Sequence, residues 1–213
     1  MPVSLSPQDT EEDLLDSHKP GSSKTEYYRY MSYAPLSEEA TRKARGLFMP
    51  GHADWGTFSI LFSQPVCALQ VLHKSGVFMW VQHKPYTLIV NAGQCLELLT
   101  GGLFKSTIHR VVTPPQDQKH CLRVGVFYFS RPNDDYTPEP FKSPVLKELA
   151  SDKPLDPSVT YSTTEFLEAK RHGYLKPDFN FDKPREEGHE DPFREDDTFK
   201  LLEKPLVHKI AAA

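Results

Sequence analysis

Apolar and polar residues alternate along short segments between residues 27 and 131, and Gly, Pro, Ser and Asn separate the segments. Residues of a strand point alternately to its two faces, so this alternation predicts half-buried β-strands. Ser75-Gly76 predicts a hairpin turn, and Gly101-Gly102 predicts a tight turn before the segment that contains His109. Eight antiparallel strands with such turns predict a mainly β fold, the jelly roll or double-stranded β-helix. The expected strands cover residues 27–34, 56–63, 67–74, 77–83, 87–93, 94–101, 106–113 and 122–130.

The pattern changes after Asn133. Ser143 followed by Pro144 predicts the start of a short helix. A second helix is predicted within 162–174, because acidic residues come early, basic residues come late and Gly173 ends it. The expected organisation is a polar N-terminal segment (1–26), a jelly-roll domain (27–133), C-terminal helices (134–175) and a charged, Pro-rich polar tail (176–213).

His52 and Asp54 form a His-x-Asp pair, and His109 follows as a single histidine in a later β-rich segment. Two imidazoles and one carboxylate occupy one face of a metal ion and leave the other open, as in non-heme Fe(II) oxygenases. Zinc hydrolases more often use three histidines, or two histidines and a glutamate. Residues i and i+2 of an extended segment share a face, so the pair can reach one ion. The His-x-Asp spacing by itself also occurs by chance, with a solvated histidine. Because His109 completes the set, we predict that His52, Asp54 and His109 are metal-binding catalytic residues.

Arg123 lies within an apolar β segment, with Leu122, Val124 and Val126 around it. An arginine is costly to bury there unless an anion pairs with it. Its guanidinium fork suits a carboxylate held through two hydrogen bonds. An edge-strand arginine that reaches solvent is the alternative. Together with the predicted metal ligands, Arg123 indicates a site for a dicarboxylate that chelates the metal at its other end.

Five segments together resemble the C-terminal catalytic domain of the isopenicillin N synthase-like 2-oxoglutarate/Fe(II) dioxygenases. They are YYRYMSYAP, GHADWGTFSILF, LQVLHKSGVFMWV, TLIVNAGQCLELLTGGLFKSTIHRVV and LRVGVFYFSRP. The resemblance implies that His52, Asp54 and His109 bind Fe(II). It further implies that Arg123 binds 2-oxoglutarate and that Tyr33 contacts the same co-substrate. The implied reaction uses O2 to oxidise a small organic substrate, most often by hydroxylation, with release of succinate and CO2.

Three features depart from the family pattern. Gly125 stands where the family usually has the serine of an Arg-x-Ser motif, and Met31 stands where many members have Asn. About two dozen residues precede the first expected strand, in place of a substantial N-terminal domain. This indicates either a minimal variant or a fragment, and it predicts exposed apolar sheet surface.

Composition adds few constraints. The chain has 213 residues and a formal charge of −4, which suits one domain with appendages and gives no sign of nucleic acid or an anionic membrane as partner. Cys67, Cys95 and Cys121 lie in apolar contexts without Cys-x-x-Cys spacing, as expected for thiols in a reducing compartment. No membrane span or secretory signal is apparent, so a cytoplasmic location is expected.

Two other functions stay open at this point. A cupin-like metal isomerase or hydrolase on the same barrel would keep the three metal ligands and show no dependence on 2-oxoglutarate. A truncated, inactive dioxygenase remnant would bind metal poorly. Fold by itself does not choose among these functions.

Overall fold

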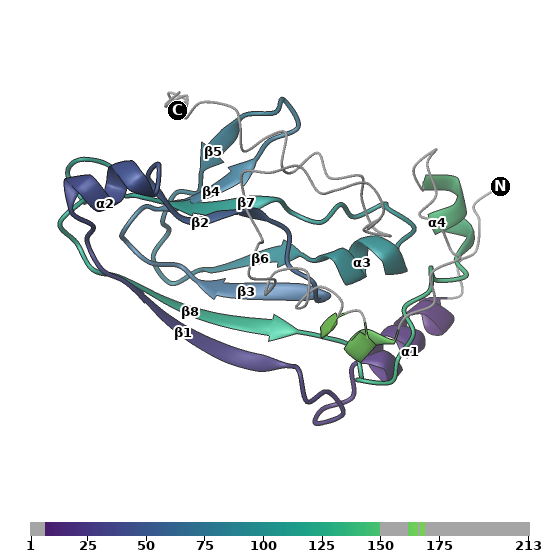
Figure 1. The fold of residues 1–213 in the computed structure, drawn as a ribbon. Helices are drawn as coiled ribbons and strands as arrows, with labels where there is room; N and C mark the ends of the chain where they lie inside the picture. Colours follow the sequence, from purple (N-terminus) through teal and green to yellow (C-terminus); the bar gives the residue numbers. More distant parts are fainter. Residues whose placement is uncertain (1–6, 150–161, 166, 169–213) are drawn as a thin grey trace.

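The computed structural model describes residues 7–149, 162–165 and 167–168. The helices labelled in Figure 1 are α1 (Pro7–Ser17), α2 (Glu38–Lys43), α3 (Gln94–Leu99) and α4 (Pro144–Leu149). The strands of this part of the chain are β1 (Tyr27–Tyr33), β2 (Leu47–His52), β3 (Phe58–Phe62), β4 (Leu69–Leu72), β5 (Phe78–Trp80), β6 (Leu88–Ala92), β7 (His109–Val112) and β8 (Arg123–Ser130).

The strands form two four-stranded sheets, and every pairing is antiparallel. One sheet has the order β1-β8-β3-β6, and the other has the order β2-β7-β4-β5. Figure 1 shows the sheets stacked face to face, with α2 at one end and α1, α3 and α4 at the other. This arrangement confirms the predicted jelly roll.

Seven of the eight expected strands are present, and the prediction of a strand over 94–101 is wrong. Gln94–Leu99 form helix α3, in which all six residues are buried. The apolar residues Cys95, Leu96, Leu98 and Leu99 follow the i, i+1, i+3, i+4 spacing of a helix, but a short apolar run does not by itself separate helix from strand. The helix follows Gly93 and ends before the tight turn at Gly101-Gly102, where both φ angles are positive.

The sequence does not predict strand β2, because its segment LFMPGH contains two residues that are rare in strands. Proline lacks a donor for the sheet ladder and is tolerated at sheet edges and bulges. Strand β2 lies at the edge of its sheet, and its pairing with β7 shifts register between Met49 and His52. The bulge thus accommodates Pro50 and Gly51 immediately before the first expected metal ligand.

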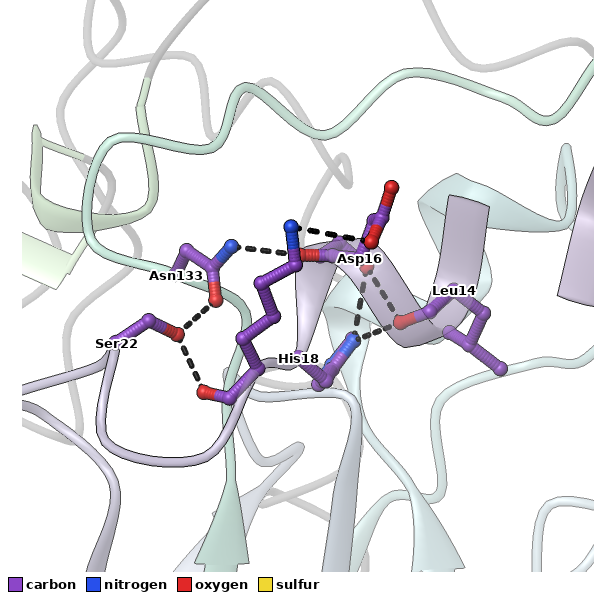
Figure 2. Close-up of polar contacts among 7 residues, drawn as sticks. Leu14, Asp16, His18, Ser22 and Asn133 are labelled. Carbon is purple, nitrogen blue, oxygen red and sulfur yellow. Dashed lines mark hydrogen bonds and ion pairs between the residues drawn. The ribbon is translucent and has the colours of Figure 1, made fainter. Parts of the chain in front are cut away.

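The N-terminal segment forms a helix that the sequence does not indicate. Helix α1 ends at Ser17, which is 2% exposed, and the chain after it is tied to the end of β8. Asn133 donates from its backbone N–H to the carbonyl of Ser17 (2.7 Å) and from its side chain to that of Asp16 (2.8 Å). Ser22 donates to the side-chain oxygen of Asn133 (Figure 2). Residues 14–22 therefore pack at one end of the jelly roll.

At the other end of the chain, α4 confirms the helix predicted to start at Pro144. Residues 163–165 and 167–168 of the second predicted helix are also helical. The remainder of that helix and the predicted tail (176–213) lie outside the described residues.

The sheet that contains β1 and β8 has an exposed apolar outer face. Tyr28 and Tyr30 of β1, Val124 of β8, and Leu88 and Val90 of β6 are each more than half exposed. Extended apolar surface of this kind is typical of a face that packs against another segment or partner.

Two further expectations can be compared with the structure. Cys67, Cys95 and Cys121 are unpaired, as expected, and burial raises the pKa of the Cys95 thiol to about 12. Within the described part of the chain, no helix combines the length and the apolar character that crossing a bilayer requires.

Gly93 provides a test of how tightly α3 packs. A Cβ at this position would lie 2.0 Å from the carbonyl oxygen of Gly56, so neither backbone can accept a side chain without moving. We expect Gly93→Ala to lower the free energy of unfolding by about 3 kcal/mol, measured by urea denaturation. Gly21→Ala is the control: no atom lies within 4 Å, and only its positive φ opposes substitution. Gly21→Ala should lower the free energy of unfolding by about 1 kcal/mol. Equal losses of stability in the two variants would contradict the close contact between Gly93 and Gly56.

Candidate metal centre and co-substrate pocket

Pairing of β2 with β7 brings two of the expected metal ligands together. His52 and His109 are Cα partners across this antiparallel pair, and their ring centroids lie 4.4 Å apart. His52 is the last residue of β2 and His109 is the first of β7. The two imidazoles therefore meet at the same end of the sheet, although they are far apart in the sequence.

Asp54 lies in the loop after β2, and the start of α3 holds this loop. The backbone N–H of Gln94 donates to the carbonyl of Asp54 (2.8 Å), and that of Cys95 donates to Gly56 (3.1 Å). Gly93 donates in the same way to Thr57 (3.0 Å). Amides at the start of a helix have no partner within the helix, so the loop carbonyls satisfy donors that would otherwise be unpaired.

The Asp54 carboxylate lies between the two imidazoles. Its Oδ1 is 3.7 Å from Nε2 of His52, and its Oδ2 is 3.8 Å from Nε2 of His109. One ligand atom from each of the three residues lies within 4.8 Å of the others. Donors that are each about 2 Å from a shared ion are separated by about 3–4 Å, so this set fits a single metal ion.

Hydrogen bonds orient all three side chains. Nδ1 of His52 donates to the carbonyl of Pro50 (3.0 Å), and Nδ1 of His109 donates to that of Thr107 (2.9 Å). A neutral imidazole with its proton on Nδ1 carries its lone pair on Nε2, the atom that faces Asp54. Asn91, which the sequence analysis did not single out, donates to Oδ2 of Asp54 (3.0 Å). Partners of this kind orient the ligands of metal sites.

The electrostatics favour the protonation states that a metal requires. Burial lowers the pKa of His52, and the neighbouring His109 lowers it further. Burial by itself would raise the pKa of Asp54, but His109 and His52 outweigh burial and hold the pKa below its ordinary value. A neutral imidazole and an ionised carboxylate are the forms that coordinate metal ions.

Helix α3 also anchors the segment that leads to His109. The Glu97 side chain, which is buried, accepts hydrogen bonds from the backbone N–H (2.9 Å) and the hydroxyl (2.5 Å) of Ser106. Lys105 lies 3.6 Å from the other Glu97 oxygen. Ser106 therefore ties the segment before His109 to helix α3.

Arg123 is 2% exposed, at the start of β8, and lines a small, partly open pocket of about 20 Å³. Its guanidinium carbon lies 4.9 Å from the ring centroid of Tyr33, its Cα partner on β1. Its Nε and Nη1 atoms are buried without a hydrogen-bond partner. Burial lowers the pKa of Arg123, yet a guanidinium remains charged at neutral pH. Unpaired, buried donors on a charged group are the feature expected of a site that receives an anion.

Two of the three departures from the family pattern, Met31 and Gly125, have structural counterparts. The hydroxyl of Tyr33 donates to the sulfur of Met31 (3.3 Å), so Met31 holds the ring that stacks with Arg123. A Cβ at Gly125 would lie 2.4 Å from the ring of Phe127, so this ring occupies the space that a side chain at 125 would need.

Comparison with known proteins identifies the family. The family model of the 2OG-Fe(II) oxygenase superfamily matches residues 26–132. The chain belongs to this superfamily. A 2-oxoglutarate-dependent dioxygenase of Aspergillus fumigatus is 28% identical over 169 residues, which cover 71% of this chain and 42% of that protein. A second, from Dothideomycetidae sp., is 37% identical over 113 residues, covering 49% and 34% of the two chains.

Solved structures agree with this assignment. A full-length Neurospora crassa protein in complex with alpha-KG and thymine has a TM-score of 0.58 at 25% identity, over 69% of this chain and 44% of that one. JOX2 in complex with 2OG, Fe and JA has a TM-score of 0.53 at 26% identity, over 66% and 38% of the two chains. The chain thus spans about two fifths of the length of the proteins it matches. The superfamily takes its name from 2-oxoglutarate and Fe(II), and both the Neurospora crassa and the JOX2 structure contain this co-substrate, 2-oxoglutarate.

His18 connects this oxygenase's N-terminal helix to the loop that carries Asp54. Its Nδ1 donates to the carbonyl of Leu14 (2.9 Å), as Figure 2 shows, and its Nε2 lies 2.7 Å from the hydroxyl of Thr57. Thr57 is fully buried, and its backbone N–H donates to Ser130 (3.0 Å). No sequence motif indicated this contact, because it joins two segments whose separation in the chain follows no pattern.

The stability of the protein should depend on pH through His18. Burial lowers its pKa from the ordinary value of 6.5, although the Leu14 carbonyl and Glu26 oppose this shift. The unfolded chain therefore binds the proton more readily. The stabilisation is complete above pH 6.5 and is lost as the pH falls through the lower pKa of the folded protein.

We expect His18→Gln to be about 1 kcal/mol less stable than the parent at pH 8, because a largely buried hydrogen bond is lost. The difference should shrink below about pH 6.5, as measured by urea unfolding between pH 8 and 5. The exposed His120 provides the control variant His120→Gln, for which the difference should stay near zero. A difference for His18→Gln that is constant over this range would contradict the assignment.

Proposed function

We propose that this chain is an Fe(II)- and 2-oxoglutarate-dependent dioxygenase that oxidises, most often by hydroxylation, a small organic substrate. Succinate and CO2 are the expected co-products. The observation that carries the proposal is the arrangement of two Nε2 atoms around one carboxylate. Because the chain spans only part of its relatives, the activity is proposed for the protein to which this sequence belongs.

His52, Asp54 and His109 are the proposed ligands of Fe(II). Two imidazoles and a carboxylate leave adjacent coordination positions open, which suits O2 and a chelating 2-oxoacid. When bound, iron and 2-oxoglutarate supply the oxidative chemistry, and the protein supplies binding and orientation. The Nδ1 hydrogen bonds keep both Nε2 lone pairs directed toward the ion, and Asn91 fixes the carboxylate.

Arg123 and Tyr33 are the proposed binding residues for the far carboxylate of 2-oxoglutarate. Arg123 presents two buried nitrogens, Nε and Nη1, without hydrogen-bond partners, and a carboxylate is a preferred partner of a guanidinium. Tyr33 contributes through its ring, which lies 4.9 Å from the guanidinium carbon, and through its hydroxyl, which donates to Met31 and whose oxygen can accept from Arg123. The role that the resemblance gave to Tyr33 is therefore proposed to be mainly the orientation of Arg123.

The substrate is proposed only as a class. Structures of the Neurospora crassa protein contain thymine or 5-formyluracil, and another relative is named a homoarginine-6-hydroxylase. These molecules share small size and differ in charge and shape, which favours a small organic substrate without indicating which one. A cytoplasmic location, and the absence of nucleic-acid and membrane partners, stay predictions.

An anaerobic titration tests the proposal. Fe(II) followed by 2-oxoglutarate should give a saturable visible charge-transfer band in the parent protein. His109→Ala should abolish the band, because an ion held by two residues binds weakly. Arg123→Ala should raise the concentration of 2-oxoglutarate needed for half-saturation by about a hundredfold, as expected when a buried charge pair loses one partner. Arg42→Ala, on the exposed side of α2, is the matched control.

Each other outcome points to a different function. A folded protein that binds Fe(II) but gives no band with 2-oxoglutarate would support a cupin-like metal enzyme. A folded protein that binds no Fe(II) would support an inactive remnant. A band that survives His109→Ala would show that these three residues are not the metal site.

A further inference from the structure

A second unpaired donor lines the same pocket as Arg123. Nε2 of Gln64 is buried and has no hydrogen-bond partner, and Gln64 lies in the loop between β3 and β4. Buried amide donors without partners are rare in folded proteins, and each such group calls for an explanation. Two side chains from separate elements, Gln64 and Arg123, thus place buried, unpaired donors beside one pocket.

The other polar groups of this pocket are already engaged. The Ser63 hydroxyl accepts from the N–H of Lys84 (3.3 Å) and bonds Nδ1 of His83 (2.8 Å). Strand β8 offers nothing beyond Arg123 on this face, because the Phe127 ring fills the space beside Gly125. The remaining lining residues include Leu61, Val66, Leu69, Val81 and Ile89, which are apolar.

A carboxylate has more acceptor capacity than one guanidinium can use. Its two oxygens offer about four lone-pair sites, and a bidentate arginine occupies two of them. Inside an apolar pocket the remaining lone pairs need a donor, since water is largely displaced. An amide N–H is a suitable second donor because it adds no charge and no proton that titrates near neutral pH.

We propose that Gln64 donates a hydrogen bond to the far carboxylate of 2-oxoglutarate, alongside Arg123. This inference rests on the proposed function. It makes Gln64 a specificity-determining residue of this chain: it favours 2-oxoacids with a second carboxylate over those with an apolar end. In this arrangement Gln64 supplies a hydrogen-bond donor in a pocket where Gly125 replaces the serine of the family's Arg-x-Ser motif.

The experiment compares two ligands that differ only at the far end. The anaerobic Fe(II)-loaded protein is titrated with 2-oxoglutarate and with 2-oxopentanoate, which has the same length and keto-acid head but ends in a methyl group. The variants are Gln64→Leu, which removes the donor, and Gln64→Glu, which places a carboxylate against a carboxylate. Gln116→Glu, the same change at an exposed position, is the matched control.

We expect Gln64→Leu to weaken the binding of 2-oxoglutarate about tenfold, and Gln64→Glu about a hundredfold or more. Binding of 2-oxopentanoate should change less than about twofold in every variant, because it makes no contact that depends on this donor. The control should bind both ligands like the parent.

Three results would overturn the inference. A Gln64→Leu variant that binds 2-oxoglutarate like the parent would show that Gln64 makes no hydrogen bond to this ligand. The proposed role of Arg123 would be unaffected. Equal weakening of both ligands would show that Gln64 only shapes the pocket. A parent protein that binds Fe(II) without binding 2-oxoglutarate would remove the proposed function itself, and this outcome is visible before any Gln64 variant is tested.

Discussion

The antiparallel pairing of β2 with β7 is the constraint on which the site depends. It sets His52 opposite His109, and neither residue can approach the other without this register. A slip of one residue would turn one imidazole to the other face of the sheet and separate the two rings. The register is held although β2 is an edge strand with a bulge, because β7 is fixed on its other side by β4.

Helix α3 connects the two halves of this site. Its first amides hold the loop that carries Asp54, and Glu97 in its middle holds Ser106 before His109. A buried helix of six residues thus positions the segments on both sides of the expected metal. His18 adds a third support through Thr57, which ties the N-terminal segment to the same loop. Hydrogen bonds to the backbone thus hold the loop of Asp54 and the segment before His109.

The sequence predicted the fold because its strands are short, alternating and separated by strong turn signals. It indicated His52, Asp54 and His109 as metal ligands because two histidines and a carboxylate are a common ligand set, and Arg123 because a charge in an apolar strand needs a partner; these roles stay predictions. The sequence-based prediction was wrong where the local sequence is compatible with a strand but the folded structure contains a helix. Residues 94–101 are apolar enough for a buried strand, but they form a helix whose first amides bond the loop at 54–57.

The supporting residues could not be predicted for a related reason. Asn91, Glu97 and His18 act through contacts between segments that are distant in sequence, and their residue types are ordinary for strands, helices and loops. Gln64 is the same case, since an unpaired donor is visible only when its neighbours are known. A role that follows from the residue type can be predicted from the sequence. A role that depends on which residues lie next to each other can be predicted only when the fold is known.

His52 and His109 are proposed to coordinate one metal ion through Nε2 while Nδ1 of each donates to a backbone carbonyl. Proton NMR of the Co(II)-substituted protein in H2O tests this most directly, because a ligand imidazole with a protonated Nδ1 gives a strongly shifted, exchangeable N–H signal. We predict two such signals, of which one disappears in His52→Gln and the other in His109→Gln. The absence of shifted exchangeable signals in the metal-loaded protein, or their persistence in both variants, would contradict the account.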